Sequence, residues 1–250
     1  MDLDPELAAL RPLGGFFLLR VAGPGHRALP TLAEAYGGAG PQGRRDPLDV
    51  RVRRVADGVR APEARVAASI AHQGLAARLW SVALGCAALY GTLPDLNPRL
   101  LRWDPEGSAP DDLWLTRVRP GTDLARAVLD GHLHPLATAL RARHRLAPGL
   151  LRGNAASALA GAGRQLQRWA LAHDRRDIAA RARTLTAALL THPDLAGAGT
   201  LTGPATGAPS GPQAFRRRSC CLYYRVPGGG VCGDCCFPRP PRSSPRAPSG

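Results

Sequence analysis

The stretch EARVAASIAHQGLAARLWSVALGCAALY, residues 63–90, carries the strongest periodic pattern in the chain. Its apolar residues recur at spacings of four, three, four and three: Leu75, Leu79, Val82, Cys86 and Leu89. This spacing places them on one face of a helix. A proline precedes the stretch, where it is tolerated at a helix start, and Gly91 and Pro94 follow it as helix-ending residues. The pattern predicts one long helix over 63–90.

Similar signals outside this stretch predict a mainly α fold with a small β-hairpin. Residues 100–104 and 113–118 flank a Pro-Glu-Gly-Ser-Ala-Pro turn and are predicted to pair as the hairpin, and residues 16–21 are predicted as a strand. Further helices are predicted at residues 29–36, at 123–131 with Thr122 as cap, at 135–145, from an N-cap at Asn154 onward, and around Ile178, Ala182, Leu185 and Leu189.

The composition changes sharply near residue 196, and this change predicts the division of the chain. Residues 1–195 are expected to form a mainly helical body. Residues 196–214 are rich in Gly, Ala, Thr, Pro and Ser, which is typical of a flexible linker. A cysteine-rich segment follows at 215–237. The tail at 238–250 is mostly Pro, Arg and Ser and is expected to be disordered.

The chain is strongly basic, but its charge does not indicate a particular partner. The net charge is +14, every basic residue is arginine, and the arginines are spread along the whole chain. Such a distribution is typical of solvated helix faces, and net charge alone argues for solubility and association. Aromatic residues make up 5%, which is too few for the stacking platform of a single-strand binder. We therefore expect no nucleic-acid partner.

Neither a secretory signal nor a transmembrane segment is predicted. Asp2, Asp4 and Glu6 occupy the positions where a signal peptide would carry positive charge. The uncharged stretch at 79–93 is shorter than the roughly 18–20 residues that a membrane-spanning helix needs. These features predict a cytoplasmic protein.

Five of the six cysteines lie close together near the C-terminus: Cys220, Cys221, Cys232, Cys235 and Cys236. Disulfides are disfavoured because nothing signals export. Four thiolates bind either structural zinc or a [2Fe–2S] cluster, and the spacings alone fit both. A Cys-Cys pair without a spacer is unusual for zinc. Cys86 lies on the apolar face of the long helix and is expected to be a small buried hydrophobe.

The cysteine-rich segment resembles a known family. Its sequence RRSCCLYYR, residues 217–225, is followed by GGGVCGDC, residues 228–235. Two adjacent cysteines, ten residues and then Cys-x-x-Cys resemble the C-terminal segment of the FhuF-like ferric-siderophore reductases. A weaker resemblance covers residues 64–103, with Trp80 and Trp103, and Gly153-Asn154-Ala155-Ala156-Ser157. The resemblance implies that Cys220, Cys221, Cys232 and Cys235 bind a [2Fe–2S] cluster, with Cys236 outside the pattern.

The residues around these cysteines suit a cluster site. Consecutive strand residues point to opposite faces, so Cys220 and Cys221 need a bent backbone to reach one cluster. Pro227 and the three glycines after it are expected to reverse the chain and bring the two cysteine pairs together. Tyr223 and Tyr224 either shield the site or pack as ordinary strand residues. The nearby cations either stabilise an anionic cluster or lie in solvent: Arg216, Arg217, Arg218 and Arg225.

Few other residues carry chemistry. His132 and His134 form a weak candidate metal pair, for which ordinary roles are favoured. Asn154 and Ser157 touch substrate or cluster only by resemblance, and the favoured interpretation is a helix N-cap and a small packing residue. No dinucleotide fingerprint is present. A reductase with this sequence would therefore receive its electrons from an external donor such as a ferredoxin or reductase.

The resemblance implies a cytoplasmic ferric-siderophore reductase that donates one electron to chelated Fe(III) and releases Fe(II). The alternative is a non-catalytic binding or regulatory protein, with a structural zinc or a sensing iron–sulfur site. Turnover separates the two, because a ferric siderophore reoxidises the reduced cluster of a reductase only.

Overall fold

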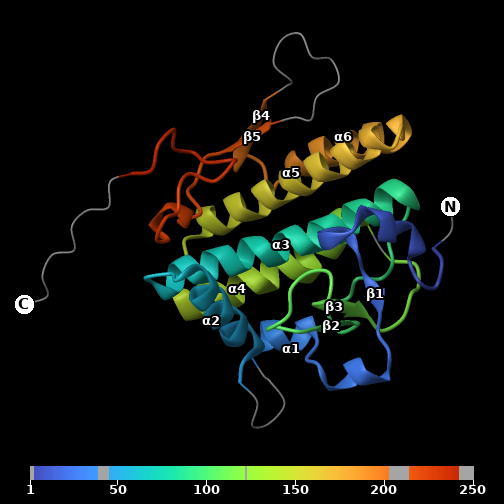
Figure 1. Cartoon of the computed structure of the whole chain (residues 1–250), viewed down its shortest axis with the longest axis horizontal. Coiled ribbons are helices and arrows are strands. Elements are labelled where there is room, and N and C mark those ends of the chain that lie inside the picture. The colour runs from blue at the N-terminus through green and yellow to red at the C-terminus, as the bar shows by residue number, and fades with distance from the viewer. Residues whose placement is uncertain (1–2, 39–44, 122, 203–213, 242–250) are drawn as a thin grey trace, which may run out of the picture.

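Helix α3 (Ala64–Leu89) runs through the middle of the computed structural model, which describes residues 3–38, 45–121, 123–202 and 214–241 (Figure 1). Its buried residues include the predicted stripe of Leu75, Leu79, Val82 and Cys86, but also Trp80 and Leu84 on other faces. A helix that is apolar all round is surrounded by other elements. The predicted helix over 63–90 is confirmed, and it is the centre of the core.

The other helices surround α3. Helix α5 (Pro148–Ala172) packs along it most extensively, and α6 (Arg176–Leu190) packs on α5. The three helices lie side by side in Figure 1. The smaller helices are α1 (Leu32–Gly37), α2 (Pro47–Val59) and α4 (His134–His144), and short 3₁₀ turns lie at Ala8–Leu13, Gly15–Phe17, Pro24–Ala28 and Tyr223–Arg225. The mainly α fold class is confirmed.

Two small sheets complete the fold. Strands β2 (Leu101–Trp103) and β3 (Leu113–Leu115) form the predicted antiparallel hairpin, and β1 (Arg20–Val21) adds to β3 in parallel. The strand predicted at 16–21 is therefore limited to its last two residues, since Gly15–Phe17 is a 3₁₀ turn.

The second sheet lies at the start of the cysteine-rich segment. Strand β4 (Gly199–Thr202) pairs antiparallel with β5 (Ala214–Arg217), so that Gly199 faces Arg217. The stretch predicted as a linker, 196–214, thus contains β4 and the first residue of β5. Residues 203–213 of that stretch, 39–44 of the N-terminal half, Thr122 and residues 242–250 of the predicted tail lie outside the described residues. The domain boundaries stay a prediction.

The two helices predicted at 123–131 and 135–145 form one continuous helical stretch. Arg126–Leu133 is π-helical and leads directly into α4. Pro135 has no N–H to donate, and its ring would clash with the carbonyl four residues earlier in an α-helix. The wider π turn accommodates the proline, and the His134 N–H bonds to the Leu129 carbonyl five residues back. The predicted break before Pro135 is wrong for this reason.

One further prediction about a helix start is wrong, and one helix was not predicted. Helix α5 begins at Pro148, so Asn154 lies inside it and does not cap it. Helix α2 has no counterpart among the predicted helices. It starts with an Asp46 side-chain cap, whose carboxylate accepts the Leu48 N–H at 2.8 Å, followed by Pro47 at the first helical position.

A buried ion pair ties α3 to the N-terminal segment and the hairpin. The Arg78 side chain is 1% exposed, and its Nε donates to an Asp112 carboxylate oxygen at 2.9 Å. Its terminal nitrogens donate to the carbonyls of Phe16 and Leu18, each at 2.6 Å. The guanidinium therefore donates to two neutral carbonyl oxygens and to the negatively charged carboxylate of Asp112. Within the described part of the chain, no helix is both long and apolar enough to cross a membrane.

Candidate metal centre

The segment after β5 bends twice and brings its two groups of cysteines together. Leu222, directly after the adjacent cysteines, has a left-handed backbone with φ 69°. Farther on, the Gly229 N–H donates to the Val226 carbonyl at 2.7 Å and closes a turn with Pro227 and Gly228 at its centre. Gly228 has φ 71°, which a type II turn requires at this position and which glycine adopts without strain. The predicted bent backbone and chain reversal are both present.

The cysteine sulfurs lie close enough to share a metal centre. The Sγ atoms of Cys221 and Cys232 are 3.6 Å apart. Two thiolates bound to one tetrahedral metal at about 2.3 Å would lie about 3.8 Å apart. Cys220 interacts with Cys221, and Cys235 and Cys236 lie within electrostatic reach of Cys220. Cys221 is buried and the other four are half-buried, as expected for a centre at the edge of the protein.

Main-chain N–H groups point at four of the sulfur atoms, and those of Tyr223 and Asp234 serve Cys221 and Cys232. The Leu222 N–H donates to Cys220 Sγ at 3.2 Å, and the Phe237 N–H donates to Cys235 Sγ at 3.4 Å. Hydrogen bonds to thiolate ligands stabilise the anion and raise the potential of an iron–sulfur centre. No such N–H from another described residue reaches Cys236. This difference favours Cys235 over Cys236 as the fourth ligand.

The thiol pKa values reflect this crowding. A hydrogen bond from Cys221 lowers the pKa of Cys220, and hydrogen bonding to the neighbouring thiols raises the pKa values of Cys221 and Cys232. Thiols this close share protons until a cation replaces those protons. Metal binding is therefore expected to release protons from the site.

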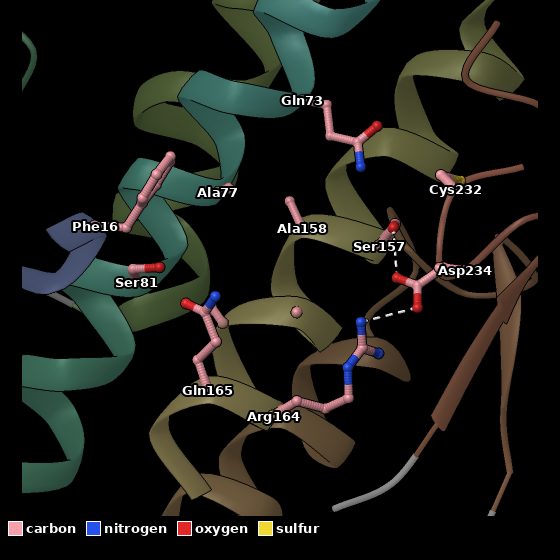
Figure 2. A pocket seen from close by; sticks show the side chains of 13 residues that line it. Phe16, Gln73, Ala77, Ser81, Ser157, Ala158, Arg164, Gln165, Cys232 and Asp234 are labelled. Atoms are coloured by element: carbon pink, nitrogen blue, oxygen red, sulfur yellow. Dashed lines mark hydrogen bonds and ion pairs between the residues drawn. The ribbon is translucent and has the colours of Figure 1, made fainter. Parts of the chain in front are cut away.

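Polar side chains of α3 and α5 hold the segment in place. The Ser69 hydroxyl donates to the Cys221 carbonyl at 2.8 Å, and the Asn154 amide donates to the Ser69 carbonyl at 2.9 Å. The Ser157 hydroxyl donates to the Asp234 carboxylate at 2.7 Å, and Arg164 pairs with the same carboxylate at 2.8 Å (Figure 2). Asn154 and Ser157 were predicted as a cap and a packing residue. They attach the cysteine-rich segment instead.

The segment also approaches α5 closely at Gly153. The Ser219 hydroxyl donates to the Gly149 carbonyl at 2.9 Å. A Cβ atom on Gly153 would lie 2.1 Å from Ser219 Oγ and 3.1 Å from an Arg217 nitrogen. Glycine at this position therefore leaves room for the side chains of Ser219 and Arg217.

We expect Gly153→Ala to weaken docking of the segment by about 1–3 kcal/mol, the usual cost of overpacking. Iron retention during gel filtration and the thermal midpoint should both fall. Gly149→Ala is the matched control, because its Cβ would meet nothing within 4 Å. That variant should be as stable as the parent or slightly more so, since alanine favours a helix over glycine. Equal behaviour of the two variants would contradict the close contact.

A pocket opens directly beside the cysteines. It has a volume of about 280 Å³ and lies between α3 and α5. Gln73 and Ser81 line it from α3, Gln165 lines it from α5, and Cys232 forms its wall at one end. Figure 2 shows Phe16 at the other end, away from Cys232. A molecule in this pocket would touch a residue that belongs to the proposed metal centre.

The other predicted candidates lie elsewhere or have ordinary roles. Cys86 is fully buried in α3, and burial raises its thiol pKa. His132 is buried, with Nε2 at 2.6 Å from the Leu96 carbonyl and Nδ1 at 2.9 Å from the Tyr36 hydroxyl, so neither ring nitrogen is free for a metal. The two ring nitrogens of His134 face the carboxylates of Asp130 and Asp194 at 3.4 and 3.2 Å on the surface.

The tyrosines and arginines of the segment differ in environment. Tyr224 packs edge-on against Phe237 with ring centroids 6.1 Å apart, whereas Tyr223 is 39% exposed. Arg225 pairs with Glu63 on the surface. Of the four arginines considered, only Arg217 is buried, at 2% exposure.

Comparison with known proteins identifies the segment. Residues 217–237 match the family model of the FhuF 2Fe-2S C-terminal domain. No curated protein matches the chain. The match confirms the predicted resemblance and gives the cofactor as a [2Fe–2S] cluster. The gathered thiols, the sulfur spacing of Cys221 and Cys232 and the N–H donors to sulfur all fit such a cluster.

Proposed function

We propose that the protein is a cytoplasmic ferric-siderophore reductase whose cluster ligands are Cys220, Cys221, Cys232 and Cys235. The observation that carries this proposal is the pocket beside Cys232. A ferric chelate seated there would bring its iron next to a cluster ligand, which is where a one-electron donor must stand. The helical body is also far larger than a purely structural metal site requires.

The bound cluster supplies one electron per turnover. Chelated Fe(III) accepts this electron and becomes Fe(II), which hard oxygen ligands hold less tightly and release. The cluster must then be reduced again by an external one-electron donor protein such as a ferredoxin. The protein's own residues position the chelate and exclude competing reactions.

The pocket lining suits an oxygen-rich, polar guest. The Ser81 hydroxyl and the Gln165 amide make no hydrogen bond to other described residues, so both remain available. Gln73 uses its carbonyl oxygen to accept a hydrogen bond from Arg217, which leaves its NH₂ group free to donate. Arg164 Nη1 is buried without a partner among the described residues. These donors would meet the carbonyl and ligand oxygens of a ferric chelate.

The direct test is anaerobic turnover. The protein is reduced with dithionite and desalted, and its visible spectrum is recorded before and after a ferric siderophore is added together with a chromogenic Fe(II) chelator. A reductase reoxidises its cluster and yields one Fe(II) per electron. A reduced cluster that stays reduced would reject the proposal and favour a sensing or regulatory protein. A colourless zinc protein would favour a structural site.

Blocking the pocket should impair reduction without changing the cluster. We expect Ala77→Trp, at a half-buried pocket position on α3, to raise the KM for the ferric siderophore at least tenfold while the reduction potential stays unchanged. Stopped-flow reoxidation over a range of siderophore concentrations measures this. Ala87→Trp is the matched control, a half-buried alanine about 15 Å farther along the same helix. Equal KM values for the two variants would exclude the pocket as the docking site.

A further inference from the structure

Arg217 is a buried cation at an unusual position. It is the last residue of β5, where alternate residues point inward, and its side chain follows Phe215 into the interior. A charged group without a counter-charge is costly to bury. The identity of its partners therefore decides what keeps this charge inside the protein.

All of its partners within the described residues are neutral. Its terminal nitrogens donate to the Asn154 side-chain oxygen at 2.5 Å, to the Gln73 side-chain oxygen at 3.2 Å and, weakly, to the Leu150 carbonyl at 3.5 Å. Its Nε has no partner. The Asp234 carboxylate, whose main-chain carbonyl accepts the Arg217 N–H, is bonded to Arg164 and Ser157.

The other deeply buried arginine shows how this fold otherwise neutralises such a charge. Arg78 is buried to the same degree as Arg217, and Asp112 gives it a carboxylate at 2.9 Å. Arg217 lacks this partner. Instead, hydrogen bonds connect its side chain to the cysteine group: Arg217 donates to Asn154, the Asn154 amide donates to the Ser69 carbonyl, and the Ser69 hydroxyl donates to the Cys221 carbonyl.

We propose that Arg217 is the buried counter-charge of the cluster and that Asn154 and Gln73 are the residues that position it. Four thiolates give the cluster a net negative charge, and reduction adds one more. A fixed positive charge in a low-dielectric setting favours the reduced state, so Arg217 raises the reduction potential.

The test is a redox titration followed by EPR on Arg217→Gln and Arg218→Gln. Both variants remove one positive charge from neighbouring positions, but Arg218 is exposed. We expect Arg217→Gln to lower the ratio of reduced to oxidised cluster at least tenfold at a fixed potential, which is about 59 mV for one electron. Arg218→Gln should change the ratio less than twofold, because solvent screens its charge. Agreement between the two potentials would overturn the inference.

A second variant keeps the inference testable if Arg217→Gln binds no cluster. Asn154→Asp keeps the size of the side chain and the oxygen that accepts from Arg217, and it places a carboxylate against the guanidinium at the cost of the amide hydrogen bond to the Ser69 carbonyl. It should lower the potential by a similar amount while Arg217 remains, and an unchanged potential would overturn the inference. The inference requires the cluster but not siderophore reduction. Shifted potentials without turnover would reject only the proposed function.

Discussion

We expect Cys221→Ser to abolish the visible charge-transfer bands and the EPR signal of the reduced protein, with iron and sulfide falling to background. Cys221 is the most buried of the clustered cysteines, and its sulfur lies 3.6 Å from that of Cys232. A serine oxygen is a harder ligand than a thiolate and does not replace it well in an iron–sulfur centre. The loss should be nearly complete, because a [2Fe–2S] cluster needs four protein ligands.

Two further cysteine variants serve as comparisons for this result. Cys236→Ser should retain the full cluster, since the proposed ligand set leaves this thiol out. Cys235→Ser should lose it, because the Phe237 N–H stabilises a thiolate at Cys235. Anaerobic purification with iron, sulfide and zinc analysis measures all three variants. Loss of the cluster in Cys236→Ser with retention in Cys235→Ser would instead assign Cys236 as the fourth ligand.

The long central helix and the cysteine segment were both accessible from the sequence, for different reasons. Helix α3 combines a regular apolar spacing with Gly91 and Pro94 after its end, and local signals of this kind are strong. The cysteine segment was recognised from spacing, and Pro227 with its glycines dictated the chain reversal. In both cases, the information lies within a short stretch of chain.

Errors arose where contacts distant in sequence decide the structure. Asn154 has a side chain typical of helix caps, but its amide is used to join Ser69 and Arg217 across the α3–α5 interface. Helix α2 contains several valines, which lower helix propensity, although its Asp46-Pro47 start indicates a helix and Leu48, Val52, Val55 and Val59 recur at helical spacings of four, three and four. Packing against α3 outweighs its weak propensity.

The sequence contains polar residues at helical spacing that attach the cysteine segment, but this spacing alone does not reveal their role. Asn154, Ser157 and Arg164 lie at spacings of three and seven, which places these three polar residues on one face of the helix. Ser69 and Gln73 form a similar pair on α3. Two facing polar stripes indicate a shared polar partner. That the partner is the cysteine segment follows only from the fold.

The largest stability effect is expected from Asp112→Ala. This change removes the one carboxylate bonded to Arg78 among the described residues and leaves a guanidinium with 1% exposure to be stabilised by carbonyl groups. Breaking a buried pair on one side typically costs about 3–5 kcal/mol. The loss should appear as a lower urea midpoint, followed by far-ultraviolet circular dichroism on the cluster-loaded protein.

Asp111→Ala is the matched control, because the neighbouring Asp111 pairs with Arg20 at the surface, where both side chains are about half exposed. An exposed pair contributes roughly 0–1 kcal/mol, and salt screens it. The contrast between adjacent aspartates therefore separates the buried charge pair from any general effect on the hairpin loop. Equal, small losses would mean that apolar packing of β2 and β3 holds this region. In that case the carbonyls of Phe16 and Leu18 would be sufficient hydrogen-bond partners for Arg78. A buried arginine in this fold would then need no anionic partner. This result would also weaken the argument that Arg217 is a counter-charge.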